Sequence, residues 1–197
     1  IVIVLTAIFI AVFCPIITKY DPLLVNVKER ITAPTGQHKL GTDEMGRDVL
    51  SRMFFGVRAS MIIGVSVAII STMAGIIVGV IAGYYNKVDN VLMRILDGVM
   101  AFPSIIIAIA LAGILGTGKI NIIIALSVAY FPTMARIVRS SVLSLRDIEY
   151  VQSIKVLGAS DAYIIIHHII PNIISPIIVQ MTFIFALAVF DEAALSY

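Results

Sequence analysis

The segment Gly113 to Ile120, GILGTGKI, has residue types and spacing that could hold a nucleotide. Gly113, Gly118 and Lys119 match the phosphate-binding loop G-x-x-x-x-G-K-[ST], in which backbone amides and the lysine contact phosphates. However, Ile120 stands where a hydroxyl should reach Mg²⁺, and the loop also needs a strand before it. We therefore expect a tight turn between two apolar stretches here, with no cofactor bound by this chain.

His167 and His168 are the residues that could suggest a metal site. Adjacent helix positions do not face each other, and no Cys or carboxylate lies at ligand spacing nearby. No Ser-His-Asp arrangement and no inward pair of intramembrane carboxylates is evident either. We therefore expect interfacial polar residues, no metal site and no catalytic residues, so the chain should not be an enzyme.

The stretch 149–172, EYVQSIKVLGASDAYIIIHHIIPN, is too polar to cross a bilayer, yet it is patterned as two short helices around one glycine. Ser144 and Asp147 resemble a capping box that would open the first helix at Leu145. Gly158 then ends this helix in the position that glycine prefers. On a helical wheel one side is apolar, formed by Tyr150, Val151, Ile154 and Leu157.

The second helix of this hairpin is predicted to begin after Ser160 and Asp161, both of which can cap it. Pro171 marks the place where the chain enters the next apolar stretch. A helix–glycine–helix unit that lies across a membrane face and is joined to a span forms a rigid lever. A soluble protein could bind such a lever and pass force to the membrane helices.

The bulk composition indicates which elements position these residues. The chain has 197 residues, of which 60% are hydrophobic and 13% charged, and its mean hydropathy is +1.06. A soluble domain of this length cannot bury so much apolar surface, so lipid must solvate it. A helical span needs roughly 20 apolar residues. The stretches that qualify or nearly qualify, all continuous and therefore helical, are Ile1–Ile17, Ser60–Tyr85, Val99–Gly116, Ile120–Val138 and Ile169–Phe190.

The chain begins inside its first apolar stretch without a methionine and stops shortly after the fifth, so we expect it to be truncated at both ends. Its single cysteine, Cys14, allows no internal disulfide. A net charge of +2 does not favour nucleic acid as a partner. Three regions are predicted: a first span at 1–17, an extracytoplasmic loop at 18–59, and a transmembrane domain at 60–197 with its surface loop at 144–170.

Within the loop at 18–59, an amphipathic helix is predicted for the segment LGTDEMGRDVLSRMFFGVRAS, capped by Thr42 or Asp43. It could lie in the membrane interface or pack on the protein itself. In the following span Gly75, Gly79 and Gly83 form a small-xxx-small face suited to close helix packing. Proline interrupts three spans, at Pro103, Pro132 and Pro176. Arg94 and Asp97 are spaced to pair on one helix face.

Several motifs together resemble the permease subunits of ABC transporters, in the dipeptide/oligopeptide/nickel importer branch. They are LGTDEMGRDVLSR at 40–52, RILDGVMAFPS at 94–104, RIVRSSVLSLRDIEYVQ at 136–152 and HHIIPN at 167–172. The hairpin resembles the EAA motif of that family, with Gly158 and Ile170-Pro171 in place. Gln152, Ser153 and Ile154 stand where Glu-Ala-Ala would be, which departs from the family's pattern.

The resemblance implies an all-α polytopic membrane protein, the transmembrane domain of a type I ABC importer, with about five of six spans present. It implies a sister permease subunit, two ATP-binding subunits that hold ATP and Mg, an extracytoplasmic substrate-binding protein, and a bacterial or archaeal inner membrane. Residues expected to couple to an ATP-binding subunit are Glu149, Gln152, Ser153, Gly158, Ala159, Ser160, Asp161 and Pro171.

Orientation and substrate are less constrained by the sequence. Lys and Arg are slightly more numerous in loops 18–59 and 117–119 than in 86–98 and 136–168, which by the positive-inside rule would place the hairpin outside. The hairpin itself indicates a cytoplasmic location. Peptides, nickel or another small solute remain open as substrates. A secondary carrier or channel is the alternative class, although such proteins commonly place ionisable residues within spans.

Overall fold

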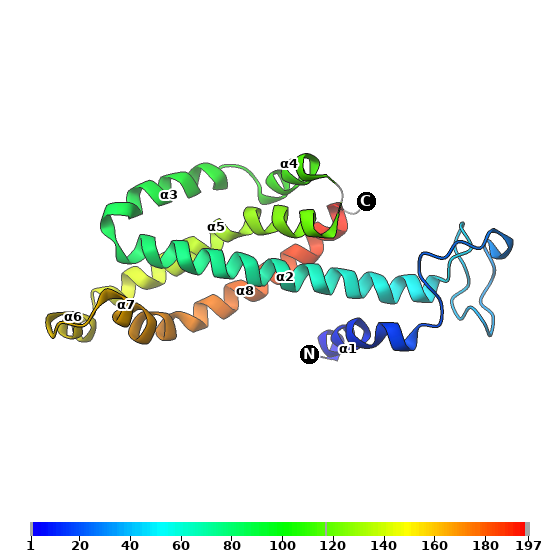
Figure 1. Cartoon of the computed structure of the whole chain (residues 1–197), viewed down its shortest axis with the longest axis horizontal. Coiled ribbons are helices and arrows are strands. Elements are labelled where there is room, and N and C mark those ends of the chain that lie inside the picture. Colours follow the sequence, from blue (N-terminus) through cyan, green and yellow to red (C-terminus); the bar gives the residue numbers. More distant parts are fainter. Residues whose placement is uncertain (1, 117, 196–197) are drawn as a thin grey trace. The chain divides into compact units, whose positions relative to one another are not determined.

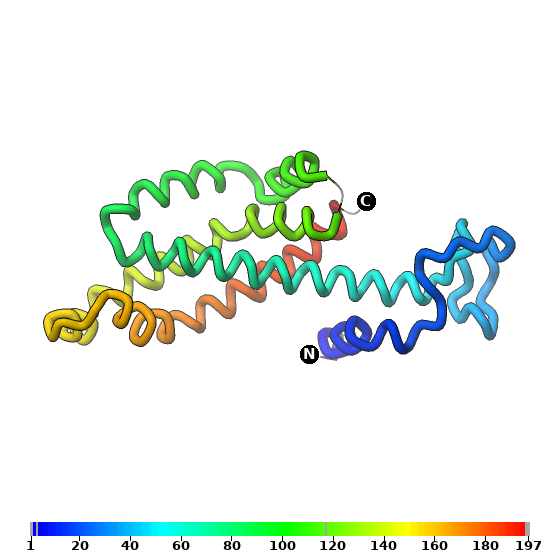
Figure 2. The backbone as a smooth tube through the Cα atoms, in the orientation of Figure 1, coloured from blue at the N-terminus to red at the C-terminus, as the bar shows by residue number. Residues whose placement is uncertain are grey.

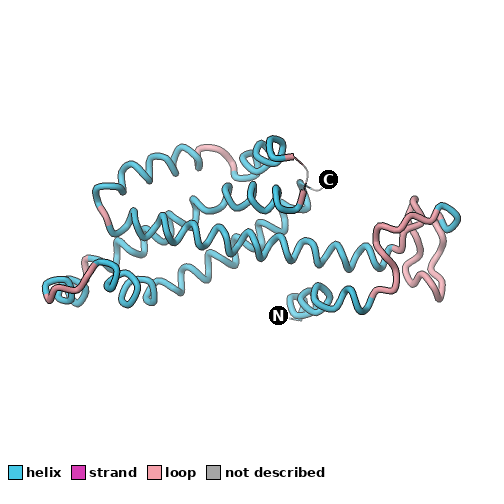
Figure 3. Tube along the Cα trace, viewed as in Figure 1, coloured by secondary structure: helices cyan, strands magenta, loops and turns pink. Residues whose placement is uncertain are grey.

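The chain is built almost entirely from helices (Figure 1). The computed structural model describes residues 2–116 and 118–195, and it divides at Ile62/Ile63 into two compact units. The described residues contain no β-strand, only an isolated bridge between Thr42 and Asp48, and loops join the helices (Figure 3). The elements are α1 (Val2–Ile17), η1 (Val27–Glu29), α2 (Val49–Tyr84), α3 (Asn86–Met100), α4 (Ser104–Leu115), α5 (Lys119–Arg146), α6 (Glu149–Val156), α7 (Asp161–Ile164), η2 (Ile165–Ile169), η3 (Ile170–Ile173) and α8 (Ile174–Leu195).

Among the described residues, three helical segments are long and apolar enough to cross a membrane: α2, α5 and the run Asp161–Leu195. The pair α3 and α4 qualifies as one broken span, which gives up to four. The apolar part of α1, Val4–Ile17, is shorter. The predicted fold class, an all-α polytopic membrane protein, is confirmed, although α4 is shorter than the span Val99–Gly116 expected from the sequence.

The expected span Val99–Gly116 is not one continuous helix. The axes of α3 and α4 differ by 84°, and Pro103 occupies the N-cap position of α4, where its missing N–H leaves no helical hydrogen bond unmade. After α4, the side chain of Asn121 donates to the carbonyl oxygens of Leu115 and Gly116 at 2.7 and 3.1 Å. The predicted tight turn between α4 and α5 includes Thr117, which lies outside the described residues.

The glycine face of α2 packs directly against α5. A Cβ added to Gly79 would lie 2.5 Å from the carbonyl oxygen of Ala135 and 2.7 Å from the Cβ of Val138. One added to Gly83 would lie 2.7 Å from the Cβ of Val142. Small residues allow such close backbone approach in membranes, where no hydrophobic effect drives helices together. The predicted intramolecular packing of this face is confirmed.

The helix α5 is central to the second unit, where it contacts α3, α4 and α8. Two carboxylates near the end of α8, Asp191 and Glu192, are buried, and the Tyr130 hydroxyl of α5 donates a hydrogen bond to Asp191. The expectation that no pair of carboxylates points inward is therefore wrong. It failed because α8 continues to Leu195, beyond the predicted end of the span at Phe190, and carries both residues into the bundle.

Ion pairs connect α3 to α5. Two hydrogen bonds join Arg139 to Asp89, from Nε to Oδ1 at 2.5 Å and from Nη2 to Oδ2 at 2.6 Å. The carboxylate of Asp97 accepts from Arg136. The predicted pairing of Asp97 with Arg94 on one helix face is therefore wrong. Asp97 and its partner are 39 residues apart, so no local spacing rule could identify the contact.

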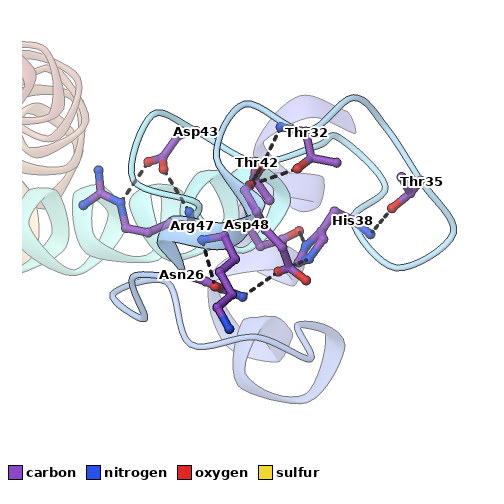
Figure 4. Close-up of polar contacts among 10 residues, drawn as sticks. Asn26, Thr32, Thr35, His38, Thr42, Asp43, Arg47 and Asp48 are labelled. Carbon is purple, nitrogen blue, oxygen red and sulfur yellow. Dashed lines mark hydrogen bonds and ion pairs between the residues drawn. The ribbon is translucent and has the colours of Figure 1, made fainter.

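In the first unit, the loop between α1 and α2 folds on itself through polar contacts (Figure 4). The Oδ1 atom of Asp43 accepts from the backbone N–H groups of Met45 and Arg47, both at 2.9 Å, and its Oδ2 pairs with the Arg47 side chain at 2.8 Å. Gly46 has a φ of +72°, and a Cβ there would lie 1.8 Å from the Asn26 carbonyl oxygen. The motif GTDEMGRD is therefore a compact loop that requires this glycine.

Helix α2 begins later than predicted. Its cap is Asp48, whose Oδ2 accepts from the N–H of Ser51 at 2.8 Å, and the predicted caps Thr42 and Asp43 lie in the loop. The helix then runs without a break from Val49 to Tyr84. Residues 49–60 of the predicted amphipathic segment therefore form the first turns of α2 instead of a separate helix, and residues 40–48 belong to the loop.

A buried histidine connects this loop to the start of α2. His38 is 7% exposed, its Nδ1 lies 2.9 Å from Oδ1 of Asp48, and its Nε2 lies 3.4 Å from Oε2 of Glu29. The hydrogen bond to Asp48 raises the pKa of His38, although burial opposes this. Burial would raise the pKa of Asp48, but hydrogen bonds from His38 and Ser51 lower it overall.

These directions predict how the loop responds to pH. Because the pKa of His38 is raised in the folded loop, protonated His38 stabilises the loop. This stabilisation is complete below the ordinary histidine pKa of 6.5 and is lost as pH rises through the folded pKa. Because the pKa of Asp48 is lowered in the folded loop, ionised Asp48 also stabilises the loop. This stabilisation is present above the ordinary aspartate pKa of 3.8 and is lost as pH falls through the folded pKa. Hydrogen exchange of residues 20–48, corrected for intrinsic rates, should therefore be faster at about pH 8.5 than at about pH 5.5. A His38→Gln variant should lack this difference, and an unchanged pH dependence in it would contradict the assignment.

Candidate functional site

The polar hairpin, residues 149–170, joins α5 to α8 (Figure 2). Its first helix, α6, ends in a Schellman motif. The N–H of Gly158 donates to the Lys155 carbonyl at 3.0 Å, and the N–H of Ala159 donates to the Ile154 carbonyl at 3.3 Å. Gly158 has a φ of +88°, a left-handed conformation that favours glycine. The predicted helix end at Gly158 is confirmed.

The predicted start of this helix is wrong. Helix α5 continues to Arg146, and the Ser144 hydroxyl donates to a carbonyl inside α5 instead of capping a new helix. Asp147 is the C-cap of α5, and α6 begins at Glu149 without a side-chain cap. The predicted opening at Leu145 failed because the preceding span extends further than its apolar residues indicate.

The second half of the hairpin begins at the predicted cap. The hydroxyl of Ser160 accepts a hydrogen bond from the N–H of Tyr163 at 3.3 Å, and Asp161 is the first residue of α7. The helix then passes through a π turn, η2, and a 3₁₀ turn, η3, which contains Pro171, before it continues as α8. Such π turns are rare and occur frequently at functional sites.

The two faces of the hairpin have different surroundings. Its inner side chains pack on the core of the second unit: Val151, Ile154, Ala159 and Ile164. At its tip, Val156 and Leu157 are each 86% exposed. Leu157 belongs to the apolar side of the predicted helix, but α6 ends at Val156 and the Leu157 side chain is exposed. The tip therefore presents two exposed apolar side chains beside the polar residues of the hairpin.

All eight residues predicted to couple to a partner lie on this one hairpin or at its junction with α8. The exposed members are Glu149, Gln152, Ser153, Gly158, Ser160 and Pro171, whereas Ala159 and Asp161 are half-buried. Gln152 and Ser153 use their side chains within the chain, donating to the backbone oxygens of Arg146 and Glu149, both at 2.8 Å. Their contact with another subunit stays a prediction.

Four further residues of the site were missed by sequence reasoning. Val156 and Leu157 were visible as apolar residues just before Gly158, but the wheel did not reveal their exposure. Tyr84 donates from its hydroxyl to Oδ1 of Asp161 at 2.8 Å. Arg146 donates to the Gly83 carbonyl and the Asn86 side chain, at 2.8 and 2.6 Å. No sequence signal could have identified the Tyr84 contact, because Tyr84 and Asp161 are 77 residues apart in the chain.

The histidines of the hairpin contact tyrosines. The ring of His167 stacks on Tyr163, with centroids 4.5 Å apart, and the ring of His168 meets Tyr150 edge-on at 6.2 Å. The His168 carbonyl accepts from the Asn172 side chain at 2.6 Å. Within residues 2–116 and 118–195, no group of three His, Cys, Asp or Glu residues could hold a metal ion. The absence of a metal or cofactor in the whole protein stays a prediction.

Long apolar helices and a capped polar hairpin between two of them place the chain among polytopic helical membrane proteins. Residues 71–197 match the family described as "Binding-protein-dependent transport system inner membrane component". This match covers more than half of the chain, and the chain therefore belongs to that family, whose domain is the membrane domain of type I ABC importers. The resemblance found in the sequence is confirmed.

Curated relatives are similar over the whole chain. It is 43% identical over 196 residues to a putative peptide transport system permease protein of Brucella suis. It is 39% and 38% identical over 197 residues to the dipeptide transport system permease protein of Alkalihalophilus pseudofirmus and the oligopeptide transport system permease protein of Bacillus subtilis. These alignments cover 100% of this chain and 66%, 65% and 65% of the respective relatives. The chain thus spans about two thirds of their length.

Proposed function

We propose that this chain is a permease subunit of an ATP-driven importer for dipeptides or oligopeptides, in a bacterial or archaeal inner membrane. It would assemble with a sister permease, two ATP-binding subunits and an extracytoplasmic substrate-binding protein. ATP and Mg would be held by the ATP-binding subunits, so this chain would receive force and would not hydrolyse ATP. The peptide assignment is supported by the names of the relatives.

The hairpin gives the strongest structural support for this proposal. It has a fixed turn at Gly158, an inner face packed on the core, and the exposed apolar residues Val156 and Leu157 at its tip. Exposed apolar residues rimmed by polar ones are typical of a protein contact site. Because the hairpin continues into α5 on one side and α8 on the other, a subunit bound to the tip could move both helices.

Cysteine labelling in cells tests both the sidedness and the partner. In a Cys14→Ala background, Val156→Cys should resist a membrane-impermeant thiol reagent in intact cells and react after lysis. Ala33→Cys, on the exposed surface of the loop between α1 and α2, should react in intact cells. With a short thiol-to-amine cross-linker, Val156→Cys should then join this chain to an ATP-binding subunit.

The reverse labelling pattern would contradict a cytoplasmic hairpin. Correct sidedness without any cross-link to an ATP-binding subunit would contradict the coupling role. Uptake of a labelled dipeptide, measured in a strain that lacks this subunit and in the same strain after complementation, separates peptide from other substrates. Restored uptake of another solute without restored peptide uptake would exclude the peptide assignment.

A further inference from the structure

The hairpin is covalently joined to α5 and α8, but not to α2 or α3. Along the chain, α3, α4 and α5 separate α2 from the hairpin, so a direct path between the two runs through non-covalent contacts. Tyr84, the last residue of α2, contacts both helices of the hairpin. Its hydroxyl donates to Oδ1 of Asp161 in α7 at 2.8 Å, and the Nζ atom of Lys155 in α6 lies 5.7 Å from the centre of its ring.

A second connection lies beside Tyr84. Arg146, the last residue of α5, donates from Nη1 to the Gly83 carbonyl of α2 and to Oδ1 of Asn86 in α3. Its own backbone oxygen accepts from Nε2 of Gln152 in α6 at 2.8 Å. The carbonyl groups in the last turn of a helix lack partners within the helix. Arg146 satisfies one of them and thereby fixes the end of α2 to the end of α5.

Polar contacts cross this junction beside the apolar core, on which Tyr84 also packs. A pocket of about 140 Å³ lies between the hairpin and the corner between α2 and α3, and its lining includes Tyr84, Asn86, Arg146, Gln152 and Lys155. Next to Tyr84 in the chain, Gly83 lies against Val142 of α5, and this close contact holds the end of α2 on α5. Tyr84 therefore connects the hairpin to the fixed end of a helix pair rather than to a free loop.

We propose that Tyr84 is a positioning residue that makes α2 move with the hairpin, through the hydrogen bond of its hydroxyl to Asp161. This inference rests on the proposed function, because it assumes that an ATP-binding subunit moves the hairpin. The hydroxyl lies inside the junction, away from the exposed tip at Val156 and Leu157. Its removal should therefore impair transmission of the movement and leave the surface for the ATP-binding subunit intact.

The test uses the whole transporter in proteoliposomes, with the substrate-binding protein and a labelled dipeptide. Tyr84→Phe removes the hydroxyl and keeps the ring beneath Lys155. We expect the ATP-binding subunits to remain bound and to hydrolyse ATP, while the number of peptides imported per ATP falls about tenfold. A hydrogen bond to a charged group changes an equilibrium by about that factor. In an Asp161→Ala background, Tyr84→Phe should cause no further fall, because the two residues act through one bond.

The matched control is Tyr85→Phe, which removes the hydroxyl of a neighbouring, exposed tyrosine. This change should leave the ratio of import to hydrolysis at its original value. An unchanged ratio in Tyr84→Phe, or a loss of bound ATP-binding subunits in proportion to the loss of uptake, would overturn the inference. The proposed function fails separately, if the Val156→Cys chain with Tyr84 intact does not cross-link to an ATP-binding subunit.

Discussion

Gly158→Val should abolish most substrate uptake while the subunit still inserts into the membrane and binds its sister permease. At a φ of +88°, a residue with a side chain is strained by about 1–2 kcal/mol. A Cβ at this position meets open space within the chain, so the valine causes no clash inside this subunit. Loss beyond the backbone strain would therefore come from the partner that receives the tip. Uptake in cells measures the loss of transport, and co-purification of the ATP-binding subunits measures whether they still bind the tip.

Gly98→Val is the matched control for this substitution. Gly98 also meets open space, but it lies inside α3 with a helical backbone conformation that valine can adopt. Valine has a slightly higher helix propensity than glycine, so Gly98→Val should retain uptake. Full uptake with normal retention of the ATP-binding subunits in Gly158→Val would show that the hairpin does not couple them.

Features that depend on neighbouring residues in the sequence could be predicted. The left-handed turn at Gly158 and the cap at Ser160 follow from residue types within a few positions. The glycine face of α2 was visible as a repeat of small residues, and its contact with α5 is confirmed. Each of these is a local signal, since a turn, a cap or a helix face involves residues close together in the chain.

Helix lengths and distant contacts could not be predicted. Polar residues mark the ends of the apolar stretches, but α2 and α8 both extend past them, because a helix continues wherever its polar side chains find partners. Asp191 is an example, since the hydroxyl of Tyr130 satisfies it inside the bundle. Spacing rules consider pairs three or four residues apart. The bond from Arg139 to Asp89 joins residues 50 apart and depends on how α3 folds back along α5.

Gly79→Ala should destabilise the subunit, whereas the same change at Gly56, an α2 glycine with open space around it, should not. The new Cβ would lie 2.5 Å from the carbonyl oxygen of Ala135, a backbone atom that cannot rotate away. The α2 and α5 backbones would have to separate, and overpacking of this kind costs about 1–3 kcal/mol. Thermal unfolding of the purified subunit in detergent should show a midpoint lowered by several degrees, together with a reduced yield in the membrane.

The control is Gly56→Ala, which lies on the same helix and meets nothing within 4 Å. Both substitutions gain the same helix propensity, about 1 kcal/mol for alanine over glycine. The difference between them therefore isolates the contact with α5, and Gly56→Ala should unfold at or slightly above the original temperature. Equal unfolding temperatures for the two variants would mean that α2 and α5 do not approach this closely in the membrane.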